Sequence, residues 1–93
     1  MTLTASDNSP VKLVYFAWVR ERMGRGEESL AIPGNVTTVA ELIRWLKLRG
    51  PEYGAAFEKP EVIRAALDRS HVKPDAKISG AREIAFFPPV TGG

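Results

Sequence analysis

The sequence predicts an α+β fold in which one mixed β-sheet packs on one main helix. Segments with the composition of β-strands flank a single amphipathic helical segment, in the order strand, strand, helix, strand, strand. Strands split about one helix in this way are typical of α+β proteins. The 93 residues suffice for one domain with a modest hydrophobic core, and 44% hydrophobic and 26% charged residues are ordinary for a globular protein.

The first predicted strand covers residues 11–18, VKLVYFAW, which are rich in β-branched and aromatic side chains. Successive side chains of a strand point to opposite faces of the sheet. Here both faces are largely apolar, so either the strand is covered on both sides or one face is kept for a partner. The two sets are Val11, Leu13, Tyr15 and Ala17 on one face, and Lys12, Val14, Phe16 and Trp18 on the other.

A turn and a short second strand follow the first strand. Gly24 and Gly26 predict a turn over residues 20–26, because glycine breaks regular structure and permits the backbone angles of tight turns. The second strand is expected over residues 28–32, where the Pro-Gly-Asn of residues 33–35 ends it.

The main helix has the clearest local pattern in the chain. Thr38 and Glu41 have the spacing of a capping box, in which the hydroxyl and the carboxylate each accept a hydrogen bond from a free backbone N–H of the first turn. Gly50-Pro51 is the expected end of this helix, and residues 55–58 can add one further helical turn. The apolar residues at helical spacing, which predict its buried face, are Val39, Leu42, Ile43 and Leu46.

Two further strands are predicted after the helix. Residues 62–67 read as the third strand, although their composition also fits a helix. Residues 68–70 predict a turn, and residues 71–78 are short and interrupted by Pro74. Residues 83–87, EIAFF, predict the last strand, which ends because the two prolines that follow have no N–H to donate to a sheet.

Alternation also predicts an apolar outer face on this sheet. In the last strand, Ile84 and Phe86 are expected to face the helix, which puts Phe87 on the opposite face. One main helix leaves little chain to cover that second face, so an exposed apolar patch is expected there, of the kind that marks a partner site. The alternative is that residues 51–61 pack over it. The predicted patch consists of Val14, Phe16 and Phe87.

Several classes of function are excluded by the residue types present. The chain has no cysteine, which excludes disulfides, thiolate metal sites and a cysteine nucleophile. His71 is the only histidine, so no metal site is predicted, and we expect it at the surface rather than in a catalytic pair with the adjacent Ser70. No glycine-rich nucleotide-binding motif occurs. An enzyme that acts on its own is difficult to build from this inventory.

The N-terminus and the charge pattern point to no membrane or nucleic-acid partner. Residues 1–10 are polar and read as a disordered lead-in rather than a signal peptide. No apolar run approaches the ~18 residues of a membrane span, so a cytoplasmic location is expected. The net charge is +2 with scattered basic residues, which is weak support for nucleic-acid binding.

The C-terminal residues 88–93, PPVTGG, predict a flexible tail with a chemical role. Glycines permit close approach of a foreign surface, and six extended residues reach about 20 Å, enough to enter the active site of another protein. The reactive group of such a tail is the Gly93 carboxylate. A carboxylate is a poor electrophile, so it must first be activated, for example as an acyl-adenylate that sulfide or an amine can displace.

The segment REIAFFPPVTGG, residues 82–93, resembles the C-terminal signature of the molybdopterin synthase small-subunit family. Residues 16–24 are similar to the F-A-x-V-R-E-x-x-G stretch of that family, and residues 38–42, TVAEL, to its first helix. Two departures concern turns: Gly80-Ala81-Arg82 stands where the family commonly has Asp-Gly-Asp, and Asp68 replaces a usual Asn.

The resemblance implies a ubiquitin-like β-grasp domain over residues 11–87, between the lead-in and the tail. It implies that an ATP-dependent activating enzyme adenylates Gly93, that a sulfur donor converts Gly93 to a thiocarboxylate, and that the tail delivers sulfur to cyclic pyranopterin monophosphate. The carrier itself would bind no cofactor. The catalytic residues are expected on the large subunit, in a heterotetramer of two small and two large subunits. The predicted partner-binding residues are Val14, Phe16, Phe87, Pro88, Pro89, Val90, Thr91 and Gly92.

Three other functions remain open from the sequence. A sulfur carrier of thiamine biosynthesis shares the Gly-Gly end. A ubiquitin-like modifier is activated in the same way but is joined to lysines of other proteins. A binding module without any chemistry at the glycine tail is the third.

Overall fold

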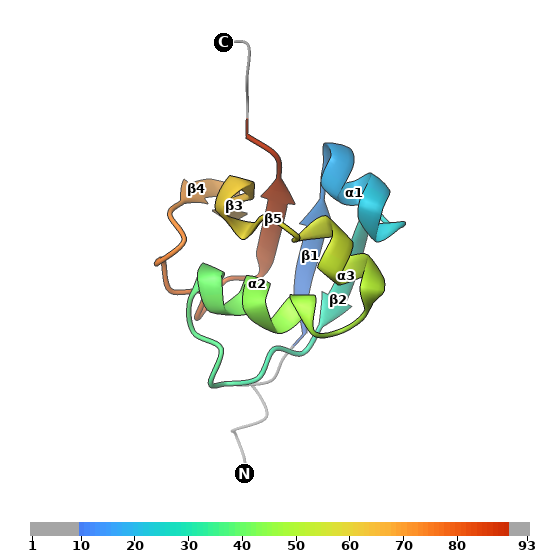
Figure 1. Ribbon diagram of the computed structural model, residues 1–93. Coiled ribbons are helices and arrows are strands. Elements are labelled where there is room, and N and C mark those ends of the chain that lie inside the picture. The colour runs from blue at the N-terminus through green and yellow to red at the C-terminus, as the bar shows by residue number, and fades with distance from the viewer. Residues whose placement is uncertain (1–9, 90–93) are drawn as a thin grey trace.

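The computed structural model describes residues 10–89, which form a five-stranded mixed sheet packed against helices. The strands lie in the order β2-β1-β5-β3-β4. The central β5 is parallel to β1 and antiparallel to β3, and the outer strands pair antiparallel with their neighbours (Figure 1). The strands are β1 (Val11–Tyr15), β2 (Glu27–Leu30), β3 (Arg64–Leu67), β4 (Ser70–Val72) and β5 (Glu83–Phe87). The α+β prediction is confirmed.

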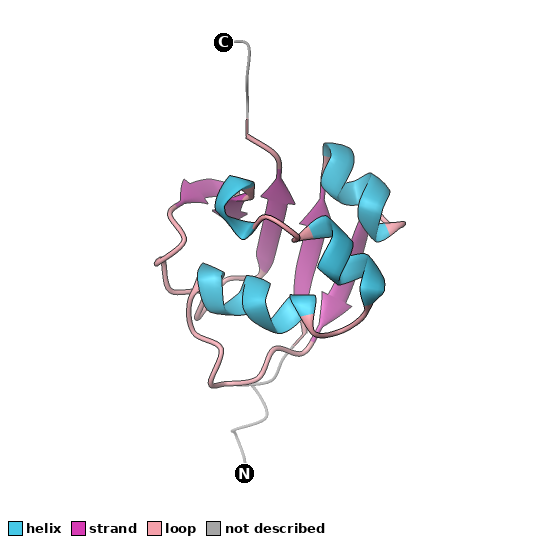
Figure 2. Ribbon diagram, viewed as in Figure 1, coloured by secondary structure: helices cyan, strands magenta, loops and turns pink. Residues whose placement is uncertain are grey.

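The helices gather on one face of the sheet, and the hydrophobic core lies between the two layers (Figure 2). Phe57, which follows α3, packs edge-on against Phe86 of β5 with ring centroids 5.1 Å apart. The helices are α1 (Ala17–Met23), α2 (Val39–Lys47), α3 (Pro51–Ala56) and the short 3₁₀-helix η2 (Pro60–Val62). The largest fully buried side chains are Leu13, Tyr15, Val19, Leu42, Leu46, Phe57, Ile84 and Phe86.

The main helix begins as the sequence predicts, with a small change in its cap. Thr38 Oγ1 accepts a hydrogen bond from the backbone N–H of Glu41 at 3.1 Å. The Glu41 carboxylate accepts from the N–H of Thr37 at 2.8 Å, one residue before the predicted partner. This backbone hydrogen bond is the main reason that the pKa of Glu41 is lowered. Gly50 and Pro51 lie beyond the helix, which ends at Lys47, and they begin α3.

The predicted buried face of α2 is confirmed. Substitutions on and off this face can test which side of the helix packs against the core. Leu42 is fully buried in the core, so Leu42→Ala is expected to lower the free energy of unfolding by about 2–5 kcal/mol, through lost burial and the cavity that remains. Leu48, just beyond the helix, is 83% exposed, and the control Leu48→Ala is expected to change it by less than about 0.5 kcal/mol. Urea denaturation measures both. Equal small losses would contradict this packing.

The first strand is shorter than predicted, and the segment after it is a helix. The strand predicted over residues 11–18 ends at Tyr15, and only residues 24–26 of the turn predicted over residues 20–26 form a turn, because α1 occupies the residues before them. Val19 and Met23 are four residues apart and both buried, so the core selects a helix here. The helix ends at Gly24, which takes the left-handed conformation (φ 79°) typical of a helix C-terminus.

Other boundaries shift by a few residues. The second strand is Glu27–Leu30 rather than 28–32, and the third begins at Arg64 because the residues before it form η2. Residues 71–78 contain the end of β4 and an isolated bridge from Lys77 to Thr38, while the last strand matches its prediction. The helical turn expected over residues 55–58 lies earlier, in α3.

The turn at Asp68 explains how the chain accommodates its departure from the family pattern. Asp68 and Arg69 both have positive φ (48° and 75°), as the two-residue hairpin between β3 and β4 requires. The Asp68 carboxylate also accepts hydrogen bonds from the backbone N–H groups of Arg82 and Glu83, each at 3.0 Å. The aspartate therefore ties this hairpin to the start of β5.

Candidate functional site

The site that the sequence singles out begins where β5 ends. As the central strand, β5 is hydrogen-bonded on both edges, to β1 and to β3, which holds its end rigidly. The chain leaves the sheet after Phe87, at the end opposite to the start of β1 (Figure 1). Pro88 and Pro89 are half-buried and donate no backbone hydrogen bond. The predicted site residues Val90, Thr91, Gly92 and Gly93 lie outside the described residues.

The three predicted patch residues lie close together on the outer face of the sheet: Val14 is on β1, Phe16 directly follows that strand, and Phe87 ends the neighbouring β5. Val14 pairs with Ala85 across β1 and β5, and Phe16 follows two residues on, where its N–H donates to the carbonyl of Phe86. The Phe16 side chain is exposed, with 50% of its surface accessible, whereas Val14 and Phe87 are more covered and only partly exposed. The structure thus places these residues on the face away from α2, at the end of the sheet from which the tail leaves.

Two alanines form the surface of this outer face beside Phe87. Ala66 of β3 and Ala85 of β5 are paired, and each is largely covered by its neighbours, with 5% and 8% of its surface exposed. His71, opposite Ala66 on β4, is exposed as predicted, and its ring centroid lies 5.0 Å from that of Phe87. The result is a shallow apolar floor with Phe87 and His71 at its side.

Residues 51–61 do not cover this face, so the alternative raised from the sequence is wrong. Tyr53, Ala56 and Phe57 of that segment are buried in the core on the helical side of the sheet. Phe57 contacts Phe86, whose side chain points away from the outer face. Among residues 10–89, the outer face is therefore left to the strands themselves.

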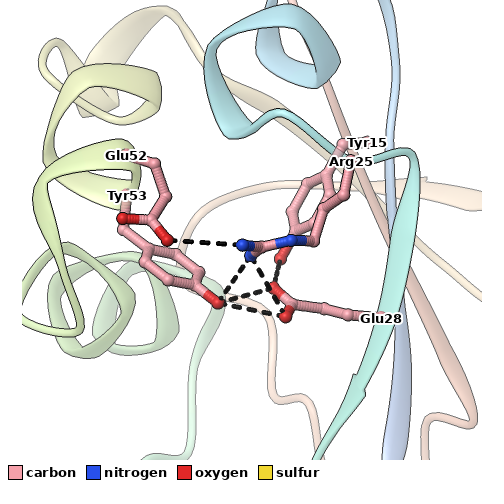
Figure 3. Close-up of polar contacts among 5 residues, drawn as sticks. All are labelled: Tyr15, Arg25, Glu28, Glu52 and Tyr53. Atoms are coloured by element: carbon pink, nitrogen blue, oxygen red, sulfur yellow. Dashed lines mark hydrogen bonds and ion pairs between the residues drawn. The ribbon is translucent and has the colours of Figure 1, made fainter.

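A partly buried polar cluster on the helical side was not predicted (Figure 3). The Glu28 carboxylate accepts hydrogen bonds from the hydroxyl groups of Tyr15 at 2.7 Å and Tyr53 at 2.8 Å. Arg25 donates to Glu28 at 3.3 Å and to Glu52 at 3.3 Å. Burial, and then the hydrogen bond to Glu28, raise the pKa of Tyr15 well above its usual range.

This cluster is structural rather than catalytic. The Glu28 side chain is only 16% exposed, and its oxygens are occupied by three donor side chains, which leaves no free acid or base. The cluster joins β1, β2 and α3, elements far apart in the sequence. Its residues share no motif or fixed spacing, so no sequence signal could have revealed it.

Other features of the described chain do not add to the site. Within residues 10–89, no group of three histidine, cysteine, aspartate or glutamate side chains is placed to hold a metal ion. No helix in the same range is long and apolar enough to cross a membrane. A groove of about 700 Å³ lies beside Val11 and Arg82, where β1 and β5 begin, which is the end of the sheet remote from Pro88.

Two proteins with similar sequences are named sulfur carrier subunits. The chain is 31% identical over 83 residues to the molybdopterin synthase sulfur carrier subunit of Escherichia coli, an alignment that covers 89% of this chain and 99% of that protein. It is 33% identical over 84 residues to the protein of the same name from Dictyostelium discoideum, covering 88% and 94% of the two chains.

Solved structures share the fold. SAMP1 from Haloferax volcanii superposes with a TM-score of 0.65 at 20% identity, covering 90% of this chain and 99% of that one. A putative molybdopterin converting factor, subunit 1, from Pyrococcus furiosus gives a TM-score of 0.67 at 24% identity, covering 88% and 99%. These neighbours confirm the ubiquitin-like β-grasp fold. The ThiS family model matches residues 13–93, from β1 to the terminal Gly-Gly, and the chain therefore belongs to the ThiS family.

Proposed function

We propose that this protein is the sulfur-carrier subunit of a molybdopterin synthase, and that Gly93 is its reactive residue. The observation that supports this most directly is the family match through the terminal Gly92-Gly93, together with relatives that are named sulfur carrier subunits of that enzyme. A rigid central strand followed by two prolines and a glycine end is a suitable device for presenting a carboxylate to another protein.

The proposed chemistry starts with activation of the Gly93 carboxylate. A carboxylate oxygen attacks the α-phosphate of ATP in an activating enzyme, which forms an acyl-adenylate and releases pyrophosphate. Sulfur at the oxidation level of sulfide then attacks the carbonyl carbon and displaces AMP, so that Gly93 becomes a thiocarboxylate. Glycine suits both steps because no side chain shields the carbonyl.

In the second half of the cycle, the thiocarboxylate sulfur attacks a carbon of cyclic pyranopterin monophosphate that bears an oxygen substituent. The bond from that carbon to oxygen breaks as the carbon–sulfur bond forms, and the oxygen leaves with a proton or with the phosphate to which it is bound. Water then cleaves the bond between the Gly93 carbonyl carbon and that sulfur, which restores the carboxylate. The dithiolene needs two sulfurs, so two carriers discharge, in keeping with two small and two large subunits. The acid and base groups of these steps are proposed to lie on the large subunit, as the resemblance implies. On this chain, the exposed His71 lies beside Phe87 near the root of the tail, with ring centroids 5.0 Å apart.

The outer sheet face is the surface on which we propose that the large subunit docks. Val14, Phe16 and Phe87 lie at the end of the sheet from which the tail leaves, so a partner bound there would receive the tail directly. Aromatic side chains are frequent hot spots in such interfaces.

Thiocarboxylate formation is the direct test of this proposal. The purified protein, incubated with its activating enzyme, ATP and a sulfide donor, is expected to gain the mass of one oxygen-to-sulfur exchange, located on the C-terminal peptide by mass spectrometry. Omission of ATP is the control and should leave the mass unchanged. If Gly93 instead becomes joined to lysine side chains and no thiocarboxylate forms, the protein is a modifier, and the proposal is wrong.

A further inference from the structure

A second groove lies on the helical side of the sheet, away from the outer face. It has a volume of about 350 Å³ and runs between α2, η2 and the β3–β4 hairpin. Its apolar wall is formed by Val39 and Ile43 of α2, Ile63 and Ala65 at the start of β3, and Val72 of β4. This volume is within the range of ligand sites, at the small end, and suits one or two side chains rather than a large cofactor.

The rim of this groove is strongly basic. Arg44 and Lys47 lie three residues apart on the same side of α2, and Lys73 lies across from them after β4. Glu61 is the one acidic residue among those that line the groove. Arg64 also borders the groove, but it pairs with Phe87 across β3 and β5, so its side chain points to the outer face. Within residues 10–89, none of these four cations has a carboxylate within 4.0 Å, since the ion pairs there involve Lys12 and Arg25.

Unpaired cations around an apolar wall favour a ligand that carries both negative charges and an apolar group. We propose that this groove binds an acidic segment of a partner protein, with one apolar side chain inserted against Ile43 and Val72 and flanking carboxylates paired with Arg44, Lys47 and Lys73. The charge complementarity favours an acidic segment. The residues that line the groove include no aromatic side chain on which a base could stack, so a single-stranded nucleic acid fits it poorly.

The groove and the outer face can be occupied at the same time. Ala65 and Ala66 are neighbours on β3, but Ala65 belongs to the core side and lines the groove, while Ala66 pairs with Ala85 on the outer floor. A partner in the groove therefore leaves the docking face and the tail free. The inference goes beyond the proposed sulfur transfer and does not depend on it.

The test is an NMR titration of the full-length protein with a synthetic peptide of two leucines flanked on each side by three glutamates. Saturable shifts are expected for backbone amides of α2 and of Val72 and Lys73, but not for Val14 or Ala85. The double variant Arg44→Glu, Lys73→Glu is expected to weaken binding about tenfold, because an exposed ion pair is worth up to about fivefold in affinity. The control Arg20→Glu reverses an exposed charge on α1, outside the groove, and should leave affinity unchanged.

Two control ligands separate the apolar contact from general attraction to anions. A peptide with serine in place of both leucines should bind at least about tenfold more weakly, since the loss of a buried leucine contact weakens binding by this order. A single-stranded oligonucleotide of equal charge should not compete. Equal binding of the serine peptide, competition by the oligonucleotide, shifts confined to the outer face, or the absence of saturable shifts would each overturn the inference.

Discussion

Deletion of Gly93, or addition of one residue after it, is expected to abolish sulfur transfer while leaving the fold intact. Each residue moves the terminal carboxyl group by about 3.3 Å along an extended tail. A misplacement of about 1 Å at a reacting centre can already cost about a hundredfold in rate. Activity is measured as dithiolene formation by the carrier, its activating enzyme and the large subunit, and the thermal midpoint of the free carrier reports on folding.

A matched control adds one residue at the N-terminus instead. The N-terminus of the described chain lies at the opposite end of the molecule from the root of the tail (Figure 1). This variant is expected to keep full activity and an unchanged thermal midpoint. Full activity in the C-terminally extended variant would contradict the sulfur-carrier function, because no other residue in the chain is proposed to carry sulfur.

Replacement of Phe87 by alanine is expected to weaken binding to the large subunit by about thirtyfold or more, the effect of removing an interface hot spot of about 2 kcal/mol. The physical reason is its position: Phe87 is half-buried on the outer face, beside Ala85 and the His71 ring, where a partner can cover it. The thermal midpoint of the free carrier should change little. Calorimetric titration against the purified large subunit measures the affinity.

Leu48→Ala is the matched control for Phe87→Ala, because Leu48 is an exposed apolar residue next to α2 rather than on the outer face. It should leave binding unchanged. Unchanged binding by Phe87→Ala, together with a large drop in thermal midpoint, would show that Phe87 stabilises the domain and is not a docking residue.

The elements that could be predicted from the sequence are those whose signal is local. The helix α2 is set by a cap residue, Thr38, and by four apolar residues at helical spacing, and both act within one element. The last strand, β5, is bounded by two prolines that cannot join a sheet. The candidate site can also be predicted from a local signal, because the order of residues along the chain is enough to place the Gly93 carboxylate next to Gly92.

The elements that could not be predicted depend on distant partners. Residues 17–23 have strand-like composition in part, yet they form α1 because Val19 and Met23 reach the core together only in a helix. The Glu28 cluster draws side chains from β1, the α1–β2 turn, β2 and α3, and no single segment contains its pattern. Local sequence likewise does not decide whether residues 51–61 cover the outer face; the packing of Phe57 against Phe86 on the core side decides it.

The sequence by itself therefore determined the class of fold, the main helix and the last strand, since each follows from residues adjacent in the chain. It also predicts a reactive chain end, for the same reason. The tertiary structure alone decided which sheet face is left uncovered, which cations surround a groove, and how Glu28 is satisfied. These features arise when strands in the order β2-β1-β5-β3-β4 bring together residues up to about 70 positions apart, which local propensities do not encode.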